Sequence, residues 1–320
     1  MEKEFKTYDE LLAILESRGM NLSTASLRKR AKKALQHEGY YNLINGYKML
    51  FLQRDTNGKF AIPDTYKDGS TVDEIRQLYY FDAKLRSIIL KNILQIEINI
   101  KNLISHSFSK VHGHKNYLVY ENFDTTQRDS EKNITGLISE IQRQLSGRVT
   151  DPSIRHYLTD HGYIPFWVLN NILSLGIISK FYSLMKQSER QEVSKIFRLQ
   201  DNELSNLLIY LSSVRNVCAH SNRLYCFRTK RPIVDLRFHV QLGIPLNASG
   251  EFEYGKRDLF AIMLIFRTML PKDQFRNAVN QVNKAVADLS PKLSVLSQQD
   301  ILKCMGFPME WRNKLLSLRS

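Results

Sequence analysis

The strongest folding signal in the sequence is a long amphipathic repeat between residues 70 and about 109. Its apolar side chains recur every three or four residues, the spacing that places them on one face of an α-helix. They include Ile75, Leu78, Leu85, Ile89, Ile93, Ile96, Ile100, Leu103 and Ile104. This is the longest periodic stretch in the chain, and it predicts one long helix.

Shorter stretches with the same spacing predict an all-α, mainly helical fold. A capping box at Thr7 and Glu10 begins the first helix, and a second begins at Ser23 or Ser26. Further helices are expected over residues 134–145, 166–185, 202–219, 259–270 and 273–289, and after Pro308. Only residues 252–254 alternate as a strand does, which allows at most one short β-hairpin.

No internal repeat and no low-complexity linker divides the chain. We therefore expect residues 1–320 to fold as a single compact unit. Residues 1–69 would form an N-terminal helical segment that carries a basic helix, and residues 70–237 would form the core. Residues 238–320 would form a C-terminal helical segment, and the two outer segments would wrap the core.

The net charge narrows the choice of partner. The 46 Lys and Arg residues outnumber the 32 Asp and Glu residues and give a formal net charge of +14. Basic side chains that neutralise phosphates release condensed counterions, so this excess favours nucleic acid as a partner. The alternative is a basic but otherwise ordinary soluble protein.

The features that the sequence lacks indicate a cytoplasmic protein. The charged N-terminus has no apolar segment typical of a signal peptide, and no run approaches the ~20 apolar residues of a membrane span. The cysteines Cys218, Cys226 and Cys304 give neither a disulfide framework nor zinc-site spacing. We interpret His112-Gly113-His114 as a loop and expect no metal or other cofactor.

The segment from Arg215 to His220, R-N-V-C-A-H, combines a fixed positive charge, an amide and an imidazole. RNA cleavage without a metal needs a group that takes the proton of the 2′-hydroxyl and a group that protonates the departing 5′-oxygen. It also needs a cation that stabilises the phosphorane. One histidine and one arginine supply half of such a site, and a symmetric dimer would supply the other half.

The spacing of the two side chains adds a condition. Five residues of continuous α-helix separate them by ~140° around the axis. Arg215 and His220 therefore converge only if the helix ends near Ala219 or if the arginine wraps round it. The same spacing also occurs where a cation merely lies near the negative end of a helix.

Other blocks precede and follow this segment in a characteristic order. They are G-Y-Y-N-L with G-Y at residues 39–47, L-Y-Y-F-D-A-K-L-R at 78–86, P-F-W with L-G at 165–176, and M-G-F-P with Trp311 at 305–311. Together with R-N-V-C-A-H, they resemble the Abi-like (abortive infection) family of the HEPN superfamily of helical ribonucleases. The resemblance extends over most of the chain.

The resemblance implies a HEPN-like helical bundle over residues 70–237. It also implies a homodimeric, metal-independent endoribonuclease used in phage defence or as a toxin. Arg215 and His220 would be the catalytic pair, and Asn216 would orient the phosphate or the histidine. Some relatives associate with a structured noncoding RNA that restrains them, so RNA is expected as substrate and also as an antitoxin. Two other functions stay open: a noncatalytic RNA-binding protein of a defence ribonucleoprotein, and a protein–protein defence adaptor.

Glu97 is the most informative polar residue outside this segment. It lies in line with Ile93, Ile100 and Ile104 on the apolar face of the long helix. A carboxylate buried there needs a partner. That partner would be Arg215 or His220, which would make Glu97 part of the catalytic site, or else Lys101 one turn further on.

Two basic segments are predicted to contact RNA. The second helix would turn Leu27, Ala31 and Ala34 inward and its cations outward; these are Arg28, Lys29, Arg30, Lys32 and Lys33. Few acids stand near this run in the sequence. After the motif, aromatic rings alternate with basic residues, a mixture that suits single-stranded RNA; the cations are Arg223, Arg228, Lys230, Arg231 and Arg237. The alternative is that both runs are solvated faces. We expect Tyr225 and Phe227 to be core.

The remaining aromatic clusters are interpreted as structural. Tyr40, Tyr41 and Tyr47 would pack as a corner between helices, where the neighbouring glycines allow close approach. Trp167 and Trp311 are predicted to lie in the core.

Overall fold

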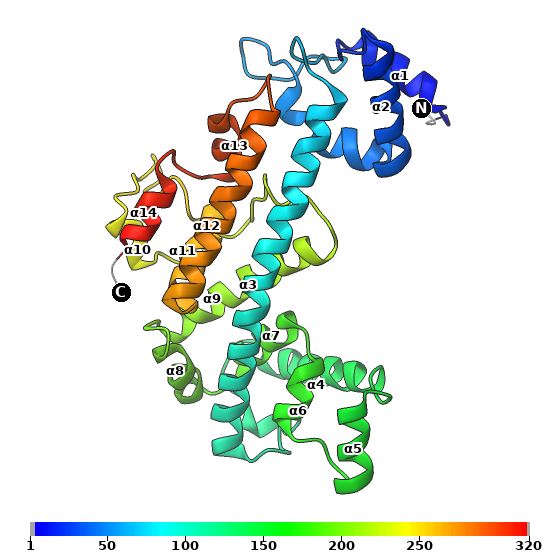
Figure 1. Cartoon of the computed structure of the whole chain (residues 1–320). Helices are drawn as coiled ribbons and strands as arrows, with labels where there is room; N and C mark the ends of the chain where they lie inside the picture. The colour runs from blue at the N-terminus through cyan, green and yellow to red at the C-terminus, as the bar shows by residue number, and fades with distance from the viewer. Residues whose placement is uncertain (1–3, 319–320) are drawn as a thin grey trace.

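The computed structural model describes residues 4–318, and its longest element is the predicted long helix. α3 (Val72–His112) begins at Thr71, which forms a capping box with Glu74. It ends at Gly113, whose φ of +79° lies in the left-handed region. Most of the predicted apolar positions are buried, and α3 runs through most of the length of the molecule (Figure 1).

Shorter helices surround α3, and the all-α fold is confirmed. They are α1 (Tyr8–Ser17), α2 (Ala25–Glu38), η1 (Tyr41–Asn45), η2 (Lys48–Phe51), η3 (Tyr120–Asn122), α4 (Ser130–Ser146), α5 (Pro152–His161), α6 (Phe166–Ile172), α7 (Leu175–Leu184), α8 (Gln187–Lys195), α9 (Asp201–Ala219), α10 (Arg237–Gln241), α11 (Leu259–Met269), α12 (Lys272–Leu289), η4 (Ser290–Lys292), α13 (Gln298–Met305) and α14 (Trp311–Ser317). Residues 252–254 contribute one isolated bridge, Leu246 to Phe252, rather than a hairpin.

Different helices pack against the two halves of α3 (Figure 1). α12 lies along the first half, and α2 also packs there. The second half contacts α6, α7 and α8. α9 packs against α3, α7 and α8. α11 is buried along nearly its whole length and packs against α12.

The helix predicted over residues 166–185 is divided into α6 and α7. Leu173 is extended, with ψ of 140°, and Ser174 begins the second helix. The Ile177 N–H donates to the Ser174 hydroxyl oxygen at 3.4 Å, the usual role of an N-cap serine. Periodicity did not reveal the break because apolar residues continue across it. The sequence pattern also missed α5, α8, α10 and α13, which are short or mostly polar.

The histidine pair at the end of α3 has structural partners. His112 Nε2 lies 2.6 Å from Glu189 Oε1, and the His114 ring packs against Tyr163 and Trp167. Between residues 4 and 318, no group of three or more His, Cys, Asp or Glu side chains could hold a metal ion. No helix in that range combines the length and the apolar character that crossing a bilayer requires.

Candidate functional site

The R-N-V-C-A-H segment lies at the C-terminal end of α9, which stops at Ala219 as predicted. The His220 N–H donates to the Asn216 carbonyl at 3.0 Å, and the Asn222 N–H donates to the Val217 carbonyl at 3.0 Å. Ser221 has φ of +55° and turns the chain away from the helix axis. These bonds end the helix within the motif and fix the backbone that carries His220.

One face of α9 is buried in the core and the opposite face is open. The buried side includes Cys218, and burial raises the pKa of its thiol to about 12. The thiol therefore stays protonated near neutral pH, and the side chain packs in the hydrophobic core. The open side carries Ile209, Ser213, Asn216 and His220 at helical spacing. Asn216 and His220 thus lie on an accessible stripe.

His220 lines a cavity of about 460 Å³ together with residues of the N-terminal segment. Tyr41, Asn42 and Asn45 contribute from η1, a π-helical turn, and Arg223 contributes from the chain after the motif. The Arg223 guanidinium donates to the Gly46 carbonyl at 2.9 Å and joins the two walls. The predicted tyrosine corner is therefore wrong for Tyr41, which is 78% exposed at this cavity.

Asp82 is the buried centre that holds this region together. Its carboxylate accepts from the Tyr47 hydroxyl at 2.8 Å and from the Arg86 guanidinium at 2.5 Å. It also accepts from the backbone N–H groups of Leu224 at 3.1 Å and Tyr225 at 2.7 Å. Three segments far apart in the sequence, the G-Y block, α3 and the chain after the motif, therefore meet at one side chain.

The environment of Asp82 has opposing effects on its ionisation. Burial raises the pKa of the carboxyl, and Arg86, Tyr47 and the two backbone donors offset part of that rise. Tyr225 is buried and stacks on Tyr47 with ring centroids 5.7 Å apart, as expected for a core ring. The segment that follows His220 is thus fixed by a desolvated ion pair and by packed rings.

Arg215 lines a different cavity from that of His220. This polar cavity has a volume of about 420 Å³ and is also lined by Glu97, Lys101 and Arg148. Glu97 Oε1 pairs with Lys101 Nζ at 2.8 Å, so the helix-neighbour partner is present. Within residues 4–318, Glu97 Oε2 and Arg215 Nε are buried and reach no hydrogen-bond partner. A buried polar atom without a partner costs ~1–3 kcal/mol, which suits a cavity that receives a polar ligand.

Arg215 and His220 therefore line separate cavities of one chain. Although the helix ends at Ala219, as convergence requires, the arginine is half-buried beside α3 and the histidine faces η1. Glu97 lines the arginine's cavity. Within one chain, the cation that shares a cavity with His220 is Arg223.

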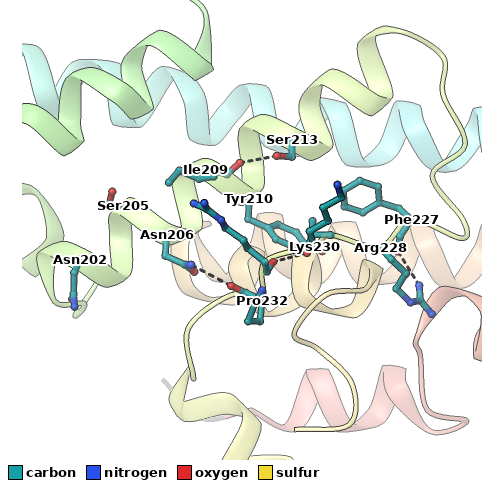
Figure 2. A pocket seen from close by; sticks show the side chains of 12 residues that line it. Asn202, Ser205, Asn206, Ile209, Tyr210, Ser213, Phe227, Arg228, Lys230 and Pro232 are labelled. Carbon is teal, nitrogen blue, oxygen red and sulfur yellow. Dashed lines mark hydrogen bonds between the residues drawn. The ribbon is translucent and has the colours of Figure 1, made fainter. Parts of the chain in front are cut away.

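The basic residues after the motif surround a third cavity, of about 590 Å³, shown in Figure 2. Arg228, Lys230 and Arg231 line it on one side. The open face of α9, including Ile209 and Ser213, forms the other side. Phe227, expected in the core, is only partly buried and lines this cavity, and Arg237 lies outside it, over the Phe238 ring. Because Asn216 follows Ser213 by three residues, the cavity adjoins the motif along α9.

The basic helix is less free than the sequence suggested. As predicted, Ala31 and Ala34 are buried. Acids from other helices nevertheless pair with three of its five cations, in the pairs Arg28–Glu16, Arg30–Asp73 and Lys32–Asp9. Few acids lie near these cations in the sequence, but folding brings acids of α1 and α3 beside α2. The expectation that the cations of α2 are not neutralised is therefore wrong for these three. Lys29 and Lys33 are exposed.

The family model for Abi-like proteins matches residues 33–226, more than half of the chain. The chain belongs to this family. In this Abi-like protein, the match extends from within α2 to just past the motif, so it includes α3, α9 and the Asp82 centre. Arg228, Lys230 and Arg231 lie beyond it. No curated protein and no solved structure matches the chain.

Several residues of these cavities were missed from the sequence of the Abi-like protein. Arg148 beside Arg215 stands in no recognisable short motif. Asn42 and Asn45 beside His220 lie within the G-Y-Y-N-L and G-Y block, but nothing in the sequence assigned them to a site. Their cavities form only when separate segments pack together. Asp82 lies within a block that resembles the family. Of its four hydrogen-bond donors, Arg86 belongs to the same block, whereas Tyr47, Leu224 and Tyr225 come from other parts of the chain.

Proposed function

We propose that this protein is an RNA-binding abortive-infection protein that cleaves RNA without a metal. The observation that carries the proposal is the exposure of Asn216 and His220 on one stripe of α9, between the cavity with Arg223 and the cavity with Arg228, Lys230 and Arg231. Membership of the Abi-like family supports it. Placement in the HEPN superfamily is part of the proposal.

The proposed reaction is attack by the ribose 2′-oxygen on the adjacent phosphorus. A bond from O2′ to phosphorus forms as the bond from phosphorus to O5′ breaks. His220 takes the 2′ proton or donates a proton to O5′, and Arg215 stabilises the charge on the phosphorane. The products are a 2′,3′-cyclic phosphate and a 5′-hydroxyl.

A homodimer would complete the site. One chain offers one His220, whereas the reaction uses both a base and an acid. In a two-fold dimer the exposed stripes of α9 would face one another and contribute both histidines. Within one chain, Arg215 and His220 line separate cavities. In a dimer, the Arg215 of one copy could lie near the His220 of the other copy. A structured noncoding RNA held by the same basic surfaces would restrain the enzyme.

The separate cavities of Arg215 and His220 also favour a second function. A noncatalytic RNA-binding protein would use both cations to hold a guide or antitoxin RNA and would need no convergence. His220 would then affect affinity rather than cleavage. A protein–protein defence adaptor is the third possibility, and it would bind no RNA.

RNA binding is tested by salt dependence. Replacing Lys230 with alanine should weaken binding of all RNA sequences and lower the slope of log K against log salt by ~0.7–0.9, the loss of one phosphate contact. Fluorescence anisotropy of labelled RNA between low and high salt measures the slope. Lys84→Ala is the matched control, because Lys84 pairs with Asp288 and lines neither the cavity of Lys230 nor that of His220. Equal slopes for wild type and Lys230→Ala would remove this cavity from the RNA surface.

A further inference from the structure

The exposure of Trp167 departs from the expected core position. The two tryptophans differ strongly, because Trp311 is 2% exposed and Trp167 is 49% exposed. The neighbours of Trp167 on α6, Phe166 and Val168, occupy the core instead. A single exposed apolar side chain is unremarkable by itself. Trp167 differs because it borders a cavity whose other walls are polar.

That cavity has a volume of about 400 Å³, within the usual size range of small-ligand sites. Five of its lining residues come from one face of α3 at spacings of three and four; they are Asn102, Ser105, His106, Ser109 and Lys110. His114 and Trp167 form the aromatic wall, with ring centroids 5.5 Å apart. Within residues 4–318, the Ser109 hydroxyl is buried and has no hydrogen-bond partner.

We propose that this cavity binds one unpaired nucleotide of an RNA strand. The base stacks on Trp167 and His114, and the Ser109 hydroxyl and Asn102 amide bond its polar edge. Lys110 contacts the phosphate. An aromatic wall beside hydroxyl, amide and cationic groups is the combination that recognises single-stranded RNA. Lys110 pairs with Glu192 at 3.1 Å, but both side chains are exposed, so phosphate can displace this weak pair.

The position of the cavity connects it to the proposed catalytic region, and the inference rests on RNA being the ligand there. Lys101 and Val168 line the cavity of Arg215, and their chain neighbours Asn102 and Trp167 line this one. Four residues of α3, a rise of ~6 Å, separate Lys101 from Ser105. An RNA strand held at Arg215 can therefore continue along α3 and place a flanking base against Trp167.

Tryptophan emission tests the contact directly, without cleavage. The signal of Trp167 is the difference between the emission of wild type and that of Trp167→Phe, since both retain Trp311. Titration with single-stranded oligouridylate should quench this difference signal, and a duplex RNA of the same length should not. Equal quenching by the duplex would contradict stacking of an unpaired base. A blue shift that grows with protein concentration and needs no RNA would assign Trp167 to a contact between copies and overturn the proposal.

Affinity provides the second measurement. Trp167→Ala should weaken binding of the same oligonucleotide roughly 5- to 150-fold, the range expected for loss of one stacked base. Phe5→Ala is the matched control, because Phe5 is 88% exposed and lies outside the cavity. Unchanged affinity in Trp167→Ala would overturn the nucleotide site while RNA binding by the wild type still supports the proposed function. No RNA binding by the wild type would overturn both.

Discussion

Replacing His220 with alanine is expected to lower the rate of RNA cleavage by ~10²–10⁴-fold, the usual contribution of a general acid or base. RNA affinity should stay nearly unchanged, because the cations that bind phosphate remain. His220 is exposed at the end of α9, so its loss should not disturb the core. Single-turnover cleavage and equilibrium RNA binding, measured on the same preparations, separate the two effects. In cells, toxicity should disappear with the cleavage.

Arginine variants locate the catalytic cation in the same assay. Arg215→Ala should reduce cleavage far more than binding if Arg215 stabilises the phosphorane. Arg223→Ala should act mainly on binding. The reverse result would assign the catalytic cation to Arg223, which shares a cavity with His220 in one chain. Equal loss of affinity and cleavage in His220→Ala would contradict a catalytic histidine and favour the noncatalytic RNA-binding protein.

Replacing Asp82 with alanine is expected to lower the free energy of unfolding by ~3–5 kcal/mol, the usual effect of removing one partner of a buried ion pair. Arg86 would be left as an uncompensated buried charge, and the N–H groups of Leu224 and Tyr225 would lose their acceptor. Urea denaturation, with the transition followed by circular dichroism, measures the loss.

An exposed ion pair between α3 and α12 provides the control for Asp82. Lys84 and Asp288 are each about half exposed, and Asp288→Ala should cost only ~0–1 kcal/mol. Asp82→Asn retains an acceptor for the Tyr225 N–H. Its loss of free energy of unfolding should therefore lie between the losses of Asp82→Ala and Asp288→Ala. If Asp82→Ala were as stable as Asp288→Ala, Asp82 could not be what fixes the chain after His220.

The helices that the sequence predicts best are those with local signals. α3 has a capping box, a continuous apolar face and a terminal glycine, and α9 has an apolar face that ends within the motif. These patterns depend on neighbours three or four residues away. The break at Ser174 is marked by one N-cap serine within a continuous apolar run, so periodicity does not reveal it. The exposure of Trp167 depends on packing against other segments, which periodicity predicts poorly.

In the candidate site, too, the sequence predicts the features that depend on nearby residues and does not predict those that depend on tertiary packing. The motif and the basic residues after it could be read directly from the sequence, and so could the alternative partner of Glu97, since Lys101 is one turn away. The neutralisation of α2 by Glu16, Asp9 and Asp73 required the tertiary fold. The separation of Arg215 from His220 also required the tertiary fold. Residues of α3 line the cavity of Arg215, and residues of η1 line the cavity of His220.

The chemistry of the RNA ends tests the proposed function most directly. Wild-type protein and His220→Ala would each be incubated with cellular RNA in EDTA, and the new ends would be mapped and typed. We expect 2′,3′-cyclic phosphate and 5′-hydroxyl ends in the wild-type reaction alone. Cleavage that requires a divalent metal, or that leaves 5′-phosphate ends, would contradict attack by the 2′-oxygen. If both proteins retained a defined RNA and neither produced new ends, that result would also contradict the proposed cleavage.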